Sequence, residues 1–172
     1  LLPDNVTKID LPIARQISLY TDIIVLVKLI HLFYNEKYNI IYSITPKGGL
    51  LAMIAGWCTC VPIRIHTFTG QVWVNFKGIY KYILKMTDRI TANLATISIV
   101  DSPSQREFLL KNNIIKNYKS TVLGHGSISG VDLNRFYPNP LARKIVRQEL
   151  NVNDSIIVFL FVGRLKKDKG VV

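Results

Sequence analysis

Short β-rich runs alternate with helical runs along most of the chain. The hydrophobic and polar pattern predicts strands at residues 6–9 (weakly), 39–44, 61–66, 96–101, 119–123 and 155–162. It predicts helices at residues 21–35, 49–60, 78–95, 103–112 and 139–150. Apolar strands alternating with helices predict an α/β fold: a Rossmann-like parallel sheet with helices on both faces.

In a parallel sheet of this kind, ligands bind beyond the carboxyl ends of the strands. The segments after the predicted strands are also the polar and glycine-rich ones: residues 45–49, 66–71, 101–105, 124–130 and 163–170. We therefore expect a functional site at this edge. Ser102, Pro103 and Gln105 have the form of a helix capping box, and residues 124–130 fit a flexible connection better than a dinucleotide fingerprint.

The first of these segments carries Lys47, Gly48 and Gly49 between a predicted strand and helix. Glycines let a ligand approach the backbone, and the N–H groups at a helix start favour anions. A plain strand-to-helix turn explains the same residues equally well.

The second segment opens with His66 and continues with hydrogen-bonding side chains at Thr67, Thr69 and Gln71. A histidine here can position or polarise a substrate hydroxyl near neutral pH, and its neighbours can bind a sugar. The alternative is structural: all four side chains can instead satisfy loop backbone groups.

The helix at residues 78–95 has a basic stripe beside an apolar face. The stripe repeats every four residues, at Lys77, Lys81, Lys85 and Arg89, and the opposing face carries Ile79, Tyr82, Ile83, Met86 and Ile90. This pattern suits the anionic surface of a membrane. An ordinary solvated outer face is the alternative.

The last segment follows the most strongly β-branched run. Gly163 removes bulk where a phosphate can approach, Arg164 can bind phosphate through two N–H groups, and Lys169 adds a point charge. Charged loops are common, so this spacing alone is a weak signal.

Composition places the chain among folded proteins with anionic partners. It has 172 residues, 49% hydrophobic and 19% charged, with a formal net charge of +11. The two cysteines, Cys58 and Cys60, lack metal-ligand spacing and are expected to be small buried side chains in a reducing compartment. The most apolar run, residues 23–34, is too short to span a bilayer.

Five stretches, in order, resemble the retaining glycosyltransferases of family four, which have the GT-B fold. They are residues 45–51, 61–73, 101–106, 126–132, and 161–165 with 168–170. The likeness is to bacterial enzymes that extend polysaccharides on a lipid carrier. It implies a nucleoside diphosphate sugar donor, often a UDP-sugar, transfer with retention, and no metal ion or other cofactor.

The resemblance also implies roles for residues and domains. His66 would face the donor sugar, and Arg164 and Lys169 would hold its diphosphate, where cations stabilise the developing charge. Residues 1–130 would form the acceptor-side domain without its first strand, and residues 131–172 the linker and start of the donor-binding domain. The enzyme would lie in the cytoplasm, peripherally on the inner face of the cell membrane.

The chain begins at Leu1 rather than Met, and the family's acidic donor motif is not seen before Val172. We therefore expect part of a longer reading frame, inactive by itself. Two alternatives stay open: a non-catalytic basic module for membrane or nucleic acid, although no nucleic-acid motif is present, and a sugar-nucleotide epimerase. The sugar, acceptor, linkage and oligomeric state are not indicated.

Overall fold

The computed structural model describes residues 3, 5–13, 18–127, 130–163 and 165. Arg164 and Lys169, the two cations expected to hold a diphosphate, lie outside the described residues. The chain divides into two units, Leu1–Ile128 and Ser129–Val172, and each is described by itself.

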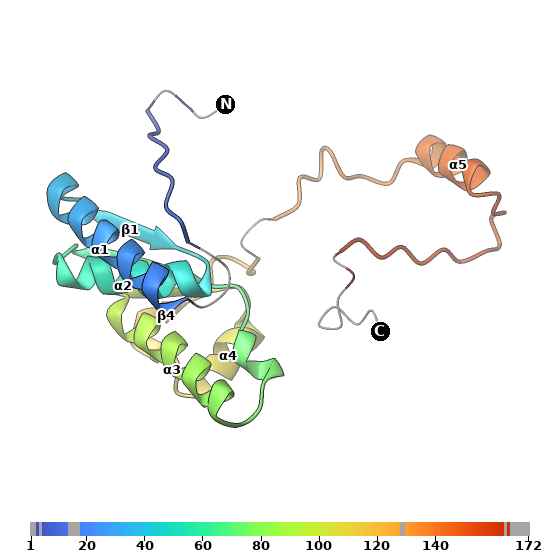
Figure 1. Cartoon of the computed structure of the whole chain (residues 1–172). Helices are drawn as coiled ribbons and strands as arrows, with labels where there is room; N and C mark the ends of the chain where they lie inside the picture. The colour runs from blue at the N-terminus through green and yellow to red at the C-terminus, as the bar shows by residue number, and fades with distance from the viewer. Residues whose placement is uncertain (1–2, 4, 14–17, 128–129, 164, 166–172) are drawn as a thin grey trace. The chain divides into compact units, whose positions relative to one another are not determined.

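The first unit is built on a parallel sheet with strand order β1-β2-β3-β4 (Figure 1). The strands are β1 (Ile40–Ser43), β2 (Ile63–Phe68), β3 (Ile97–Val100) and β4 (Ser120–Thr121). The helices are α1 (Leu19–Glu36), α2 (Pro46–Cys58), α3 (Gly78–Leu94) and α4 (Pro103–Lys111), with 3₁₀ turns η1 (Val72–Asn75) and η2 (Asn117–Lys119). The expected α/β, Rossmann-like parallel sheet is confirmed.

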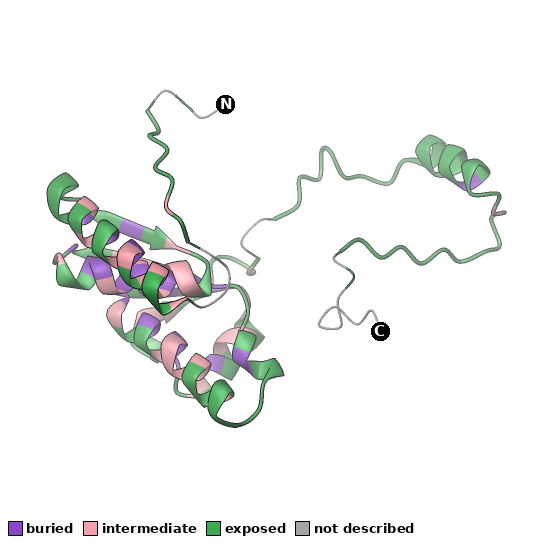
Figure 2. Cartoon of the chain, viewed as in Figure 1, coloured by how far each residue is buried: buried purple, intermediate pink, exposed green. Residues whose placement is uncertain are grey.

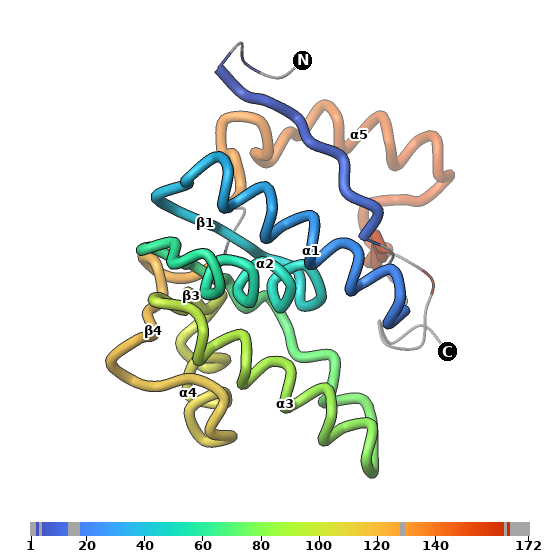
Figure 3. Tube along the Cα trace, turned by 60° about the vertical axis from the view of Figure 1, so that its left-hand side comes forward, coloured from blue at the N-terminus to red at the C-terminus, as the bar shows by residue number. Residues whose placement is uncertain are grey.

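The hydrophobic core lies between one face of the sheet and the helices. Helix α2 lies beside both α1 and α3, so the three form a layer (Figure 3). One buried cluster joins α1 and α2 to Ile41 of β1, and a second joins α3 and α4 to Phe68 of β2 and Val100 of β3. Figure 2 shows buried positions concentrated between these elements.

Much of the opposite face of the sheet is apolar and exposed, although Thr67 on this face is buried. Because side chains alternate along a strand, this face carries Ile40, Tyr42, Ile63 and Ile97, which are between 39% and 55% exposed. Among the residues that the structure describes, no helix of the first unit forms the expected second layer on this face. Its absence there explains why isoleucines typical of a buried strand lie at the surface.

Two element boundaries differ from the expected ones and change the site. Helix α2 begins at Pro46 instead of residue 49, because proline suits a first helical position, so Lys47, Gly48 and Gly49 belong to its first turn. Strand β2 continues to Phe68, paired with β3 up to Val100. His66 and Thr67 therefore lie within a strand instead of opening a loop.

Two predicted strands, residues 6–9 and 155–162, were wrong. Both segments are described, and neither pairs with another strand in the described part of the chain. β-branched residues favour extended backbone, but a strand also needs a neighbour for its N–H and C=O groups.

The second unit contains α5 (Pro140–Glu149) and an extended segment after it. The side chain of Asn139 caps the helix by accepting from the Ala142 N–H at 3.0 Å. Arg147 is buried and donates to the backbone carbonyls of Asn153 and Ile156. These bonds fold the chain after α5 back onto the helix.

A buried polar pair ties η1 to α3. The Trp73 indole N–H donates to Asp88 Oδ2 at 2.9 Å, and the Trp73 ring stacks on Phe108 of α4 with centroids 5.5 Å apart. Burial raises the pKa of Asp88 to about 6, although the bond from Trp73 opposes this rise. The pair therefore positions a turn that the sequence pattern gave no reason to expect.

We expect Asp88 to make folding stability fall as the pH rises. Its folded pKa lies above its unfolded pKa, so the folded state binds more protons between about pH 4 and 6. Asp88→Asn keeps an oxygen that accepts from Trp73 but cannot ionise. Between pH 4 and 7, urea unfolding should show wild type losing about 2–3 kcal/mol relative to Asp88→Asn. A pH-independent difference would contradict this, and the exposed Asp10→Asn serves as the control.

Candidate functional site

The carboxyl edge of the sheet gathers parts of four predicted segments. Ser43, His66 and Ser98 lie in register across β1, β2 and β3, on the face that the helices cover. The first turn of α2 lies against His66, and the loop after β4 lies against the loop after β3. The edge is thus a contiguous arrangement of helix starts and loops.

His66 is held in one orientation. It is 2% exposed, its Nδ1 is 2.8 Å from Ser43 Oγ, and its ring packs edge-on against Phe68 with centroids 4.6 Å apart. Burial lowers the pKa of His66 to about 4. The imidazole is therefore neutral near pH 7, so it can donate or accept a hydrogen bond but does not bring a positive charge.

Gly49 is the residue that allows this packing. A Cβ atom at position 49 would lie 2.3 Å from His66 Cε1 and 2.6 Å from Nδ1. Real Cβ atoms do not approach other atoms so closely, so only glycine fits without moving the ring. The adjacent Gly48 faces a softer neighbour, because its Cβ would meet the Thr45 hydroxyl at 2.7 Å.

Lys47 is held in an ion pair. Its Nζ lies 2.6 Å from Asp22 Oδ1 of α1, and both side chains are largely buried. The ion pair joins α1 to the first turn of α2. An anion bound at this turn would share Lys47 with the Asp22 carboxylate.

The structure separates the hydrogen-bonding residues that follow His66 in sequence. Thr67 points to the opposite face of the sheet, where its hydroxyl donates to the Tyr42 hydroxyl at 3.0 Å. Thr69 is exposed after the strand. Gln71 lies near α4, and its Oε1 accepts from Gln105 Nε2 at 3.4 Å. Of these three residues, Thr67 therefore lies within β2, and only Thr69 and Gln71 lie beyond its end.

Gly126 and Ser127, within the segment expected to be a flexible connection, are held against the loop that follows β3. The Ser127 N–H donates to the Asp101 carbonyl at 2.7 Å. Gly126 has a φ of +97°, and a Cβ there would lie 2.5 Å from the same carbonyl oxygen. The close spacing of Gly124 and Gly126 was the available signal for this tight approach. The capping role of Ser102 is confirmed by the bond that it accepts from the Gln105 N–H.

The basic stripe is only partly a free surface. Lys85 donates to Asn112 Oδ1 at 2.9 Å, and Arg89 donates to the Asn113 carbonyl at 2.8 Å. Lys81 and Lys85 lie over the Trp73 ring, at 5.9 and 5.2 Å from its centroid. The interpretation of the whole stripe as one outward face was therefore wrong, and Lys77 is its most outward member.

The remaining candidates belong to other parts of the chain. Gly163 is exposed in the second unit, beside the undescribed Arg164. Cys58 and Cys60 are exposed, so the expectation of buried cysteines was wrong. In the described part of the chain, no three His, Cys, Asp or Glu side chains gather as metal ligands, and no helix combines the length and apolarity that crossing a bilayer requires.

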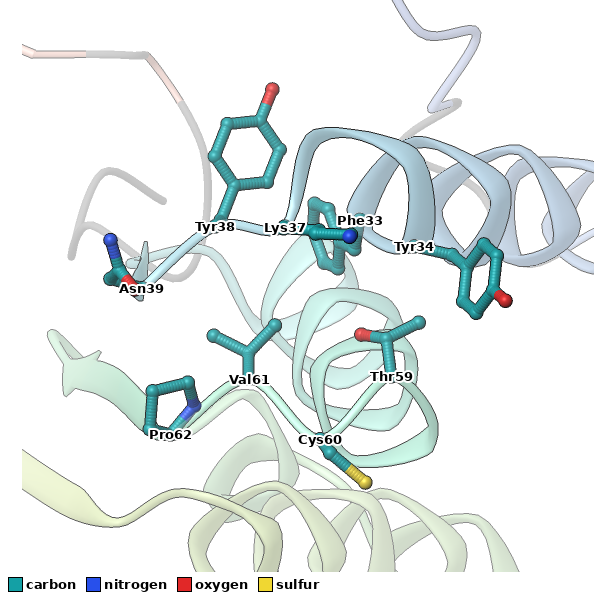
Figure 4. Close-up of a pocket in the computed structure, with 9 residues that line it drawn as sticks. All are labelled: Phe33, Tyr34, Lys37, Tyr38, Asn39, Thr59, Cys60, Val61 and Pro62. Carbon is teal, nitrogen blue, oxygen red and sulfur yellow. The ribbon is translucent and has the colours of Figure 1, made fainter.

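A hollow of about 300 Å³ lies at the other end of the sheet (Figure 4). Its lining includes Tyr38 and Asn39 just before β1, and Val61 and Pro62 just before β2. These are the amino ends of the strands. The hollow is thus distinct from the site at the carboxyl edge.

Two curated bacterial proteins are similar to almost the whole chain. CapM of Staphylococcus aureus, a capsular polysaccharide biosynthesis glycosyltransferase, is 36% identical over 170 residues, covering 98% of this chain and 44% of CapM. A UDP-Gal:alpha-D-GlcNAc-diphosphoundecaprenol alpha-1,3-galactosyltransferase of Escherichia coli is 29% identical, covering 98% of this chain and 43% of that enzyme. The chain is a relative of glycosyltransferases. No protein-family profile matches it.

Solved structures support the fold of this glycosyltransferase relative. Anabaena HepE in complex with UDP aligns with a TM-score of 0.57 at 17% identity, over 74% of this chain and 32% of HepE. HepE in complex with UDP-glucose aligns with a TM-score of 0.55 over the same shares. The chain spans less than half the length of the curated relatives it matches.

We expect Gly49→Ala to destabilise the first unit by crowding His66. Although alanine is the better helix former, the Cβ would displace a packed ring, so the free energy of unfolding should fall by about 1–3 kcal/mol. Gly48→Ala, in the same helical turn, is the matched control because the Thr45 hydroxyl can rotate away.

Urea unfolding of Gly49→Ala in a His66→Ala background isolates this contact. The penalty should largely disappear there, because the ring that the Cβ meets has been removed. An equal penalty with and without the imidazole would show that the Gly49–His66 contact is not the constraint.

Proposed function

We propose that the protein carrying this chain transfers a sugar from a UDP-sugar to a lipid-linked or polysaccharide acceptor, with retention of anomeric configuration. The observation that carries the proposal is the match of 98% of the chain to each of two curated glycosyltransferases. One is named for capsular polysaccharide synthesis, and the other for transfer from UDP-Gal to a diphosphoundecaprenol-linked sugar. An alpha-1,3 product from an α-linked donor such as UDP-galactose is the outcome of retention.

In this proposal, His66 contacts the donor sugar as a neutral hydrogen-bonding group. Ser43 holds its Nδ1, so a hydrogen bond to the donor sugar would be made through Nε2. A neutral imidazole, unlike a cation, leaves the negative charge of the diphosphate to be stabilised elsewhere. We assign that task to Arg164 and Lys169, with Gly163 allowing close approach.

The acceptor side comprises the first turn of α2 and the segment after β2. Gly48 and Gly49 present backbone there, Lys47 contributes its charge jointly with Asp22, and Thr69 and Gln71 follow the strand end. Thr67 is left out, because its side chain bonds Tyr42 on the opposite sheet face. We further propose a reaction without a metal ion, at the inner face of the cell membrane, where a lipid-linked acceptor is reached.

The test is transfer of radiolabelled sugar from UDP-galactose, UDP-glucose and UDP-N-acetylglucosamine to a polyprenyl-diphosphate-linked sugar, in the presence of EDTA. We expect one donor to give product, and His66→Ala, Arg164→Ala and Lys169→Ala each to lower kcat/KM by about 100-fold or more. Lys111→Ala is the control, because Lys111 is exposed on α4, where it pairs with Glu107.

The anomeric configuration of the product is read by NMR. Inversion would refute the retaining mechanism, and loss of activity in EDTA would refute the metal-free one. Conversion of the nucleotide sugar without any acceptor would indicate an epimerase instead.

A further inference from the structure

An exposed apolar surface lies just beyond the candidate site. It is formed by η1, the turn after it and the first part of α3, and we call it the α3 patch. Its members are between 40% and 74% exposed: Val72, Val74, Phe76, Ile79, Tyr80, Tyr82 and Ile83. The sequence pattern placed Ile79, Tyr82 and Ile83 together on the apolar face of this helix, and the structure leaves all three exposed.

The patch is exposed because only the later part of α3 packs on the sheet. The buried residues of this helix are Asp88, Thr91 and Ala92, all in its second half. The turn joining η1 to α3 protrudes from the body of the first unit (Figure 1). Apolar side chains there have no core to enter.

The protruding segment is nevertheless firmly held. Trp73 is buried at its base, bonded to Asp88 and stacked on Phe108. Phe76 packs edge-on against Tyr80, with ring centroids 4.9 Å apart. The patch is therefore presented on a rigid support instead of collapsing onto the protein.

Positive charge surrounds the patch. Residues 69–95 contain four cations, Lys77, Lys81, Lys85 and Arg89, and a single acid, Asp88. That acid is buried against Trp73 and does not face solvent beside the patch. Lys77 is exposed and Lys81 partly so, which leaves cations at the margin of an apolar surface.

We propose that the α3 patch docks on an anionic lipid bilayer, with Ile79, Tyr82 and Ile83 entering the interface and Lys77 and Lys81 contacting lipid phosphates. Aliphatic and tyrosine side chains beside lysines are typical of segments that lie in a membrane surface. The open sheet face differs, since a parallel sheet face without such a cationic margin is normally covered by protein.

The inference rests on the proposed function and locates the acceptor. Val72, the first residue of the patch, directly follows Gln71 of the candidate site. Docking through the patch would therefore bring the carboxyl edge of the sheet to the membrane surface. A lipid-linked acceptor in that bilayer would meet the side of the sheet that carries His66.

Vesicle flotation tests the proposal without donor or acceptor. The full chain is mixed with vesicles of phosphatidylcholine alone, or with 30% phosphatidylglycerol. We expect binding to the anionic vesicles, reduced at least tenfold by Ile79→Ser combined with Tyr82→Ser. Lys77→Gln combined with Lys81→Gln should weaken binding several-fold and reduce its dependence on salt.

Matched controls distinguish docking through the α3 patch from non-specific adsorption to vesicles. Leu19→Ser changes an equally exposed aliphatic residue on α1, and Lys116→Gln removes a cation outside the patch, so neither should alter binding. Circular dichroism verifies that each variant is folded. Equal losses in the controls, or no binding to anionic vesicles, would overturn the proposal. So would patch variants that change the oligomeric state and leave vesicle binding intact, because a second copy would then be the occupant.

Failure here is distinguishable from failure of the proposed function. If sugar transfer to a soluble acceptor analogue proceeds but vesicle binding does not depend on the patch, only the docking surface is wrong. If vesicle binding depends on the patch but no sugar is transferred, the membrane-docking proposal is supported and the proposed sugar transfer is wrong.

Discussion

The packing of His66 against Gly49 is the constraint on which the arrangement of the sheet edge depends. β2 is flanked by β1 and β3, so the backbone of His66 is fixed by two ladders. The ring takes the space that a side chain at position 49 would fill, and this brings the first turn of α2 down onto the sheet. Lys47 then reaches Asp22, which fastens α1 to the same turn. One small residue thus sets where three elements meet.

The strand–helix alternation was predictable because apolar runs and caps are local signals. Ser102 and Asn139 marked the starts of two helices in the sequence, and both residues cap those helices in the structure. The start of α2 followed a local signal, the proline at position 46, which placed Lys47 in the first helical turn. The end of β2 instead depended on pairing with β3, which placed Thr67 within the strand. The partnership of Trp73 with Asp88 joins residues fifteen apart across a turn, and no periodic pattern marks it. Gly126 carried a usable signal, since closely spaced glycines fit a loop pressed against Asp101.

Exposure could not be predicted from the hydrophobic pattern alone. Periodicity shows which residues share a face, but not whether another element covers that face. Ile79 and Tyr82 lie on one side of α3 as the pattern requires, yet the sheet underlies only the later part of the helix. Ile40 and Ile63 likewise lie on one side of the sheet, and no described helix of the first unit covers them. The β-branched run at 155–162 was read as a strand by composition, although pairing decides that state.

The two halves of α3 have different tasks, and the Trp73–Asp88 bond lies where they meet. On the C-terminal side of Asp88, Thr91 and Ala92 are buried. On its N-terminal side, Ile79 and Tyr82 are exposed. Because Trp73 is stacked on Phe108 and Gln71 is bonded to Gln105, the beginning of η1 is tied to α4 by two contacts. The segment between the sheet edge and the patch is therefore short and braced, not a free linker. If the α3 patch docks on a bilayer, this bracing would also fix how far the candidate site lies from the membrane surface.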